Sequence, residues 1–239
     1  MTEPLRIAMW SGPRNLSTTM MRSFSRRADC AVVDEPFYGV YLAATGLDHP
    51  MREQIMAGME ADPGGIAEGL AGPAPGGAAV FYQKHMTQHM VPGMPRDWMA
   101  ATRGVFLIRH PARVVASYAA KREAPTLEDL GFVQQADILA DSTDPIIVDA
   151  DDILRNPEAM LRALCAALGL DWDPAMLSWP AGPDPADGIW GQHWYGAIWA
   201  STGFAPWTDR PLPQVDAPDI MGPAIEIYDA MHRARLTGD

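Results

Sequence analysis

The fold class of this 239-residue chain is decided near its start by Leu5-Arg6-Ile7-Ala8-Met9-Trp10-Ser11-Gly12-Pro13-Arg14-Asn15-Leu16-Ser17-Thr18-Thr19. Residues 5–9 form a short apolar run, which predicts a buried strand. Gly12 and Pro13 then mark a loop, and Met20, Met21 and Phe24 follow at helical spacing. The segment therefore predicts a strand, a loop and a helix in succession.

Four more apolar runs, at residues 31–33, 78–82, 104–108 and 146–148, predict further strands. These runs are continuous rather than alternating, and helical patterns separate them, which is typical of a parallel sheet covered on both faces. We expect an α/β three-layer sandwich with a mainly parallel sheet of about five strands. The strands should end on one edge, at Met9, Val33, Tyr82, Ile108 and Val148.

Helices are expected near residues 54–59, after Pro111, from Pro157 to Gly169, where Asn156 is a capping residue, and near 220–235. Residues 62–77 are rich in Gly, Pro and Ala without a hydrophobic period, so they predict a surface loop. The length fits a single domain over residues 1–239.

The net charge of the chain restricts the classes of partner that it can bind. With 18 Lys and Arg against 30 Asp and Glu, the net charge is −12, which argues against a broad basic face for nucleic acid or an anionic membrane. Two cysteines, Cys30 and Cys165, are too few for a disulfide framework, and no run is long enough for a membrane span. We therefore expect a cytoplasmic protein without a signal peptide, in which an anionic ligand would need a local basic pocket.

The predicted strand ends carry the reactive side chains. Ligands of open parallel sheets bind at the carboxyl ends of the strands, and this edge is predicted to hold Arg14, Glu35, Lys84, His85 and Arg109. The loop after the first strand offers backbone N–H groups and a helix dipole to a phosphate or sulfate. It is not a Walker A loop, because it lacks the Gly-Lys pair.

Two motifs resemble those of sulfotransferases. The segment Pro13-Arg14-Asn15-Leu16-Ser17-Thr18 is similar to the family pattern Pro-Arg/Lys-Ser-Gly-Ser/Thr-Thr, except at Asn15 and Leu16. Arg109, followed by Pro111 and, eight residues after the arginine, by Ser117, is similar to the family's second motif. The resemblance implies a P-loop-like sulfotransferase fold and the donor 3′-phosphoadenosine 5′-phosphosulfate.

The resemblance also assigns residues to the donor. It implies that Arg109 and Ser117 bind the 3′-phosphate, and that the first loop binds the 5′-phosphosulfate. The residues expected to bind the donor in that loop are Arg14, Asn15, Ser17, Thr18 and Thr19. Ser201 and Thr202 stand where such proteins often supply a late donor-binding loop.

Sulfuryl transfer needs cations that stabilise the negative charge as it moves to the leaving phosphate, and a base that takes the acceptor proton. Arg14 and Lys84 can supply the cations, and Glu35 and His85 are the two candidates for the base. Glu35 lies in a Glu-Pro context that resembles the base of related bacterial sulfotransferases. His85 directly follows Lys84, whereas cytosolic sulfotransferases have their His two residues after a Lys, so we favour Glu35.

We expect transfer of a sulfuryl group to a hydroxyl or amine of a small acceptor, whose identity the sequence does not reveal. The alternatives are a P-loop phosphotransferase or NTPase, and a nucleotide-binding protein without catalysis. His85 and His89 have a spacing that suits a metal on a helix, but a third ligand is not evident, so we expect no metal site.

Overall fold

The computed structural model describes residues 3–119 and 125–238. Its centre is a parallel sheet of five strands in the order β2-β3-β1-β4-β5. The strands are β1 (Leu5–Ser11), β2 (Cys30–Asp34), β3 (Val80–Met86), β4 (Arg103–Ile108) and β5 (Ile146–Asp149). The α/β class, the parallel sheet and the five predicted strands are confirmed.

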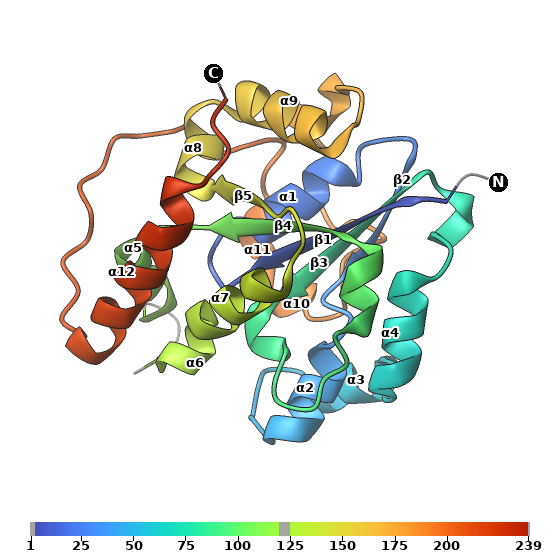
Figure 1. Cartoon of the computed structure of the whole chain (residues 1–239), viewed down its shortest axis with the longest axis horizontal. Helices are drawn as coiled ribbons and strands as arrows, with labels where there is room; N and C mark the ends of the chain where they lie inside the picture. The colour runs from blue at the N-terminus through green and yellow to red at the C-terminus, as the bar shows by residue number, and fades with distance from the viewer. Residues whose placement is uncertain (1–2, 120–124, 239) are drawn as a thin grey trace.

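Helices cover both faces of this sheet, as Figure 1 shows, where α7 and α12 lie in front of the strands and α10 and α11 lie behind them. The helices are α1 (Ser17–Phe24), α2 (Tyr38–Thr45), α3 (Arg52–Gly58), α4 (Pro63–Ala71), α5 (Pro111–Ala119), α6 (Leu127–Leu130), α7 (Phe132–Asp141), α8 (Ala150–Arg155), α9 (Pro157–Leu168), α10 (Gly191–Trp194), α11 (Gly196–Trp199) and α12 (Pro218–Arg233). In the described residues, none of these helices is long and apolar enough to cross a membrane.

The prediction that β3 ends at Tyr82 is wrong. The strand continues to Met86, because β1 also runs on to Ser11 and pairs with it in register up to Ser11 opposite Met86. All seven residues of β3 are buried, including three polar ones, so the sequence pattern gave no sign of its length. Lys84 and His85 are consequently neighbours within a strand, and their side chains point to opposite faces of the sheet.

The prediction of a loop over residues 62–77 is also wrong, because the segment contains α4. Asp62 caps this helix, since its carboxylate accepts hydrogen bonds from the backbone N–H groups of Gly64 and Gly65. Pro63 occupies the first helical turn, where a missing N–H costs nothing. Ile66 and Leu70 are four residues apart and buried, so tertiary packing outweighs the weak helix propensity of glycine.

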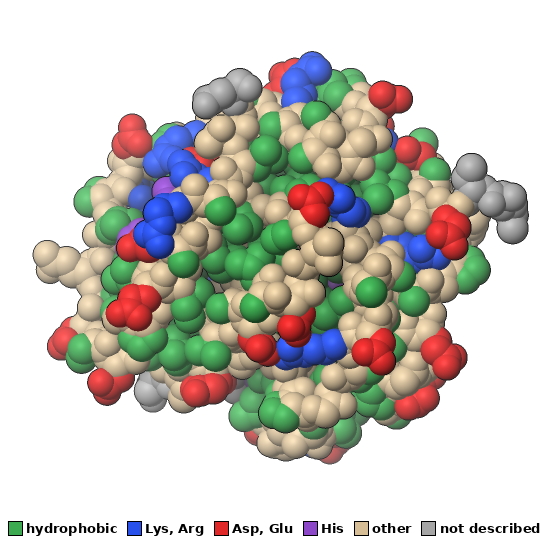
Figure 2. Space-filling model, in the orientation of Figure 1, with side chains coloured by type: hydrophobic (Ala, Val, Ile, Leu, Met, Phe, Trp, Pro, Cys, Tyr) green, Lys and Arg blue, Asp and Glu red, His purple; other side chains and the backbone are tan. Residues whose placement is uncertain are grey.

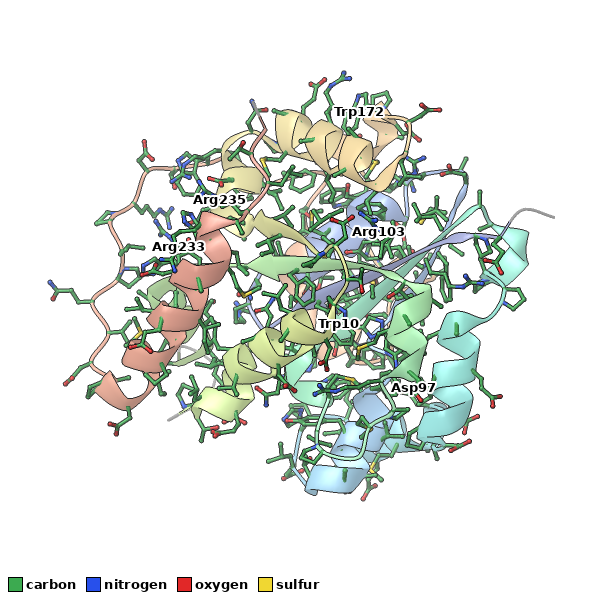
Figure 3. All side chains as sticks on the ribbon, in the orientation of Figure 1. Trp10, Asp97, Arg103, Trp172, Arg233 and Arg235 are labelled. Atoms are coloured by element: carbon green, nitrogen blue, oxygen red, sulfur yellow. The ribbon has the colours of Figure 1, made fainter. Side chains whose placement is uncertain are left out.

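Two apolar clusters hold the layers together. One packs α1, α8 and α9 against β1, β3, β4 and β5, and the other packs α4, α7 and α12 against the opposite face. Trp10, labelled near the centre of Figure 3, is buried in the second cluster, where its indole stacks on His85 at 4.5 Å between ring centroids. The acidic and basic side chains are interspersed on the face drawn in Figure 2.

Tyr82→Phe is expected to stabilise the protein. The Tyr82 hydroxyl is buried without a hydrogen-bond partner among the described residues, and such a group costs about 1–3 kcal/mol. Its loss should raise the thermal midpoint by about 2–4 °C per kcal/mol regained. The matched control is Tyr228→Phe, which removes a hydroxyl 2.8 Å from the Asp149 carboxylate and should lower the midpoint. A lower midpoint for Tyr82→Phe would contradict this prediction.

Candidate functional site

A cavity of about 420 Å³ opens at the carboxyl edge of the sheet. One side is formed by the loop between β1 and α1 together with Arg109 and Ser117, and the other by Glu35, Lys84 and the segments after β3 and around α10 and α11. The cavity therefore joins groups from the ends of β1, β2, β3 and β4, as ligand sites of open parallel sheets do.

The loop between β1 and α1 has a constrained backbone. Arg14 and Leu16 have φ of 64° and 72°, in the left-handed region that favours glycine. Leu16 stands where the sulfotransferase pattern has its glycine, so the backbone keeps the conformation although the residue differs. A Cβ on Gly12 would lie 2.3 Å from the carbonyl oxygen of Leu130, which explains why this position must be glycine.

The loop residues predicted to bind the donor line the cavity. They are Arg14, Asn15, Ser17, Thr18 and Thr19. The side-chain oxygen of Asn15 is buried and has no hydrogen-bond partner among the residues that the structure describes. Leu16 at the N-cap of α1 provides no side-chain hydrogen bond to the first turn, whose N–H groups lie at the positive end of the helix dipole.

The predicted 3′-phosphate residues lie together with Arg14. The Nε atom of Arg14 donates to the Ser117 hydroxyl at 2.9 Å, and Arg109 donates to the backbone carbonyl of Arg14 at 2.9 Å. Asp151 holds the other side of Arg109, with 3.6 Å between its carboxylate and Nε. Desolvation lowers the pKa of Arg109, an effect that Asp151 opposes. The two arginines and the serine thus form one basic end of the cavity.

A buried ion cluster occupies the opposite end. Lys84 donates hydrogen bonds to Asp34 at 2.8 Å, to the Tyr195 hydroxyl at 2.7 Å and to Oε1 of Glu35. Lys84 and Asp34 have side chains no more than 2% exposed, whereas that of Glu35 is 11% exposed and lines the cavity. Oε2 of Glu35 lies 3.9 Å from Nε2 of His89.

Asp34 and Glu35 have different surroundings, although they are neighbours in the sequence. The Asp34 carboxylate accepts hydrogen bonds from Lys84, from the Tyr195 hydroxyl at 2.8 Å and from the backbone N–H of Gly188 at 3.0 Å. Glu35 has φ of 44°, so the backbone turns sharply and points its side chain toward the cavity. Asp34 is therefore held by several donors, and Glu35 is the carboxylate that lines the cavity.

The electrostatics of the cluster follow from burial. Desolvation raises the pKa of Glu35, and the Lys84 ammonium only partly opposes this. Burial by itself would lower the pKa of Lys84, but the carboxylates of Asp34 and Glu35 raise it above its ordinary value. Lys84 is thus held as a cation. The pKa of Glu35 is higher than that of an exposed glutamate, which suits a general base.

His85 does not lie beside Glu35. Its ring packs against both Trp10 and Trp98 on the other face of the sheet, and burial lowers its pKa to about 3. The prediction that it faces the crevice is wrong, because β3 is still extended at this residue and adjacent side chains alternate.

Ser201 and Thr202 have different placements. Ser201 lines the cavity, although its hydroxyl is engaged by the indole N–H of Trp179 and by the carbonyl of Ile198. Thr202 is not among the residues that line the cavity, and its carbonyl accepts from the backbone N–H of Trp179. The structure therefore does not bring Thr202 to the predicted donor site.

Sequence reasoning did not find Asp34, Tyr195 and Trp190, or the place of His89 beside Glu35. The ring of His89 stacks between Tyr38 and Tyr41 at 4.8 and 4.6 Å between centroids, and burial keeps its pKa well below the ordinary value. Asp34 precedes Glu35 at a strand end, which was a usable signal. Tyr195 lies 111 residues from Lys84, and no local pattern connects the two.

The sequence matches the family described as sulfotransferase domain over residues 5–235, and this chain belongs to that family. The fold is similar to the sulfotransferase domain from the Synechococcus PCC 7002 olefin synthase (TM-score 0.54, 17% identity, 97% of this chain and 96% of that one). It is also similar to the sulfotransferase domain from the curacin biosynthetic pathway (TM-score 0.50, 16% identity, 79% and 82%).

Two curated relatives come from Arabidopsis thaliana. They are named branched-chain-amino-acid aminotransferase-like proteins 1 and 2, and each is 37% identical to this chain, over 209 and 203 residues. The matches cover 86% and 83% of this chain. They span 37% and 36% of the relatives' own length, little more than a third of these longer proteins.

Proposed function

We propose that this protein transfers a sulfuryl group from 3′-phosphoadenosine 5′-phosphosulfate to a hydroxyl or amine of a small acceptor. Membership of the sulfotransferase family supports a sulfuryl-transfer activity in general. The observation that carries the proposal is the cavity that has Arg14, Arg109 and Ser117 at one end and Glu35 with Lys84 at the other. We treat residues 1–239 as one catalytic domain, because the family match extends from residue 5 to 235.

The basic end suits the anionic donor. Arg109 offers a planar guanidinium to the 3′-phosphate, and Ser117 offers a hydroxyl. Because Arg14 is hydrogen-bonded to Ser117, we assign Arg14 to donor binding beside these two residues. The N–H groups at the start of α1 and the side chains of Asn15, Ser17, Thr18 and Thr19 would hold the 5′-phosphosulfate.

The acidic end suits the transfer step. Glu35 takes the proton of the acceptor, the acceptor oxygen or nitrogen bonds to sulfur, and the bond between sulfur and the bridging oxygen of the donor breaks. The electron pair of that bond leaves with adenosine 3′,5′-bisphosphate. Lys84 stabilises the Glu35 carboxylate through its hydrogen bond, so the base is ionised before the acceptor arrives.

Arg109→Ala is expected to weaken binding of adenosine 3′,5′-bisphosphate by about 10–150-fold. A hydrogen bond between charged groups contributes about 1.5–3 kcal/mol, which converts to that ratio at 25 °C. Isothermal titration calorimetry with the purified protein measures it, and Arg162→Ala is the control, because Arg162 is exposed on α9 and pairs with Glu158.

Arg109→Lys separates charge from geometry, since a lysine keeps the cation but not the fork. Binding of Arg109→Ala as tight as that of the wild type would overturn the assignment of the 3′-phosphate site. A preference of the wild-type protein for ATP with magnesium over adenosine 3′,5′-bisphosphate would overturn the proposed function and favour a phosphotransferase.

A further inference from the structure

Tyr195 reaches the Glu35 cluster from a distant part of the chain. Its hydroxyl lies 2.7 Å from Nζ of Lys84, 2.8 Å from Oδ2 of Asp34 and 3.0 Å from Nε1 of Trp190. The side chain is buried. A phenol has one proton to donate, and its two lone pairs can accept two hydrogen bonds. All three interactions are therefore satisfied at once, with Asp34 as acceptor and Lys84 and Trp190 as donors.

Lys84 is likewise fully engaged. Its ammonium has three N–H groups, and the three acceptors are Asp34, Glu35 and Tyr195. Asp34 competes with Glu35 for this cation. Because Asp34 also accepts hydrogen bonds from the Tyr195 hydroxyl and the Gly188 N–H, its negative charge is partly compensated and it attracts Lys84 less strongly. The Tyr195 hydroxyl thus influences how Lys84 is shared between the two carboxylates.

From this geometry we propose that Tyr195 is a positioning residue for the base, whose hydroxyl keeps Lys84 on Oε1 of Glu35 and so leaves Oε2 toward the cavity. The proposal rests on the role of Glu35 in the proposed function. Tyr195 acts through Lys84 and Asp34, and through a longer contact of its hydroxyl with Oε1 of Glu35 at 3.4 Å, and it takes no proton from the acceptor.

The segment that carries Tyr195 is itself anchored to the core. Arg22, buried in α1, donates two hydrogen bonds to the Asp187 carboxylate at 3.0 and 2.8 Å, and one to the carbonyl of Gly182. The indole N–H of Trp199 donates to the same carboxylate at 2.7 Å. Buried charged pairs of this kind restrict a segment to one arrangement, which places the Tyr195 hydroxyl with little freedom.

Other titratable groups also face Glu35, and the test must separate their effects. Asp34 comes from the same strand end, Lys84 from β3 and His89 from the turn after β3, while His49, from the segment between α2 and α3, lines the same cavity. Burial and the Lys84 charge lower the pKa of His89 well below its ordinary value, which favours the neutral ring. A titration of the Glu35 carboxyl in a Tyr195 variant reports on both effects of the hydroxyl, the sharing of Lys84 and the direct contact with Glu35.

Tyr195→Phe is expected to raise the pKa of Glu35 by about half a unit to one unit. Without the hydroxyl, Glu35 loses its contact with Tyr195, and Asp34 loses a donor and draws Lys84 away from Glu35; both changes favour the protonated carboxyl. Carbon-13 NMR of protein labelled at the glutamate carboxyl carbons measures this value, with the Glu35 signal identified by its absence in Glu35→Gln. Turnover should fall and its acidic limb should move to higher pH, while affinity for adenosine 3′,5′-bisphosphate stays unchanged.

Tyr228→Phe is the matched control, because it removes a buried hydroxyl from a different carboxylate, Asp149, and should leave the Glu35 titration unchanged. If Tyr195→Phe does not fold, Trp190→Phe is the second variant. It keeps the Tyr195 hydroxyl but removes the indole N–H that donates to it, and it should shift the Glu35 pKa measurably. An unchanged Glu35 pKa in a folded Tyr195→Phe protein, or in Trp190→Phe where the first does not fold, would overturn the proposal. If the Glu35 pKa shifts in Tyr195→Phe but the wild-type protein binds no adenosine 3′,5′-bisphosphate, Tyr195 keeps this role and the proposed function is overturned instead.

Discussion

Glu35→Gln is expected to lower turnover by about 10²–10⁴-fold, the usual contribution of a general base to a rate-limiting proton transfer. Glutamine keeps the size of the side chain and its contact with the cavity, but its amide does not accept the acceptor proton. Affinity for adenosine 3′,5′-bisphosphate should remain that of the wild type, because we propose that other residues of the cavity, Arg14, Arg109 and Ser117, bind it. The loss should therefore appear in kcat at saturating donor.

The measurement is the release of adenosine 3′,5′-bisphosphate from the sulfate donor in the presence of a panel of small alcohols, phenols and amines. Glu68→Gln is a matched control, because Glu68 is an exposed residue of α4 on the opposite face of the sheet. Normal turnover in Glu35→Gln would show that another group accepts the proton. Since His85 is buried against two indoles on the other face of the sheet, His89, which lines the cavity, would then be the next candidate.

Lys84→Met is expected to destabilise the protein by about 3–5 kcal/mol at pH 8, the cost of leaving buried charge without its partner. Methionine has nearly the same length and fills the same space, so the loss reports on charge rather than on packing. Asp34 and Glu35 would both lie buried beside each other with the cation absent. Urea unfolding followed by circular dichroism measures the change in the free energy of unfolding.

The cost of Lys84→Met should shrink as the pH is lowered. The pKa of Glu35 is already raised above its ordinary value of 4.5, and losing Lys84 raises it further. An acid with a raised folded-state pKa contributes stability that is fully present below its ordinary pKa and is lost as the pH rises through the folded-state pKa. The variant and the wild type should therefore approach each other between pH 8 and pH 5.

A reference variant for this comparison is Arg162→Met, because Arg162 forms an exposed ion pair with Glu158 on α9 and should cost little at any pH. A difference between Lys84→Met and the wild type that stays constant from pH 5 to pH 8 would contradict the titration of Glu35 as its source.

The amino-acid sequence by itself determined the class of fold and the basic end of the site. Five continuous apolar runs separated by helical patterns are a local property, and the parallel sheet with its carboxyl edge follows from them. The loop at residues 11–19 and the segment at 109–117 are also local, since each follows a strand directly. For the same reason, Arg14, Arg109, Ser117 and Glu35 could be predicted to meet at one edge, and the structure places all four in one cavity.

Tertiary structure decided the rest. The length of β3 depends on its pairing with β1 rather than on its own residues, and this pairing places Lys84 in the cavity and His85 among the indoles of Trp10 and Trp98. Helix α4 forms because its apolar residues are covered by the second core cluster, which composition does not reveal. Tyr195 approaches Lys84 and Asp34 because the ion pair between Arg22 and Asp187, which are 165 residues apart, anchors the segment that carries Tyr195. Contacts across such separations arise from packing and charge pairing in the folded state, so no local sequence pattern encodes them.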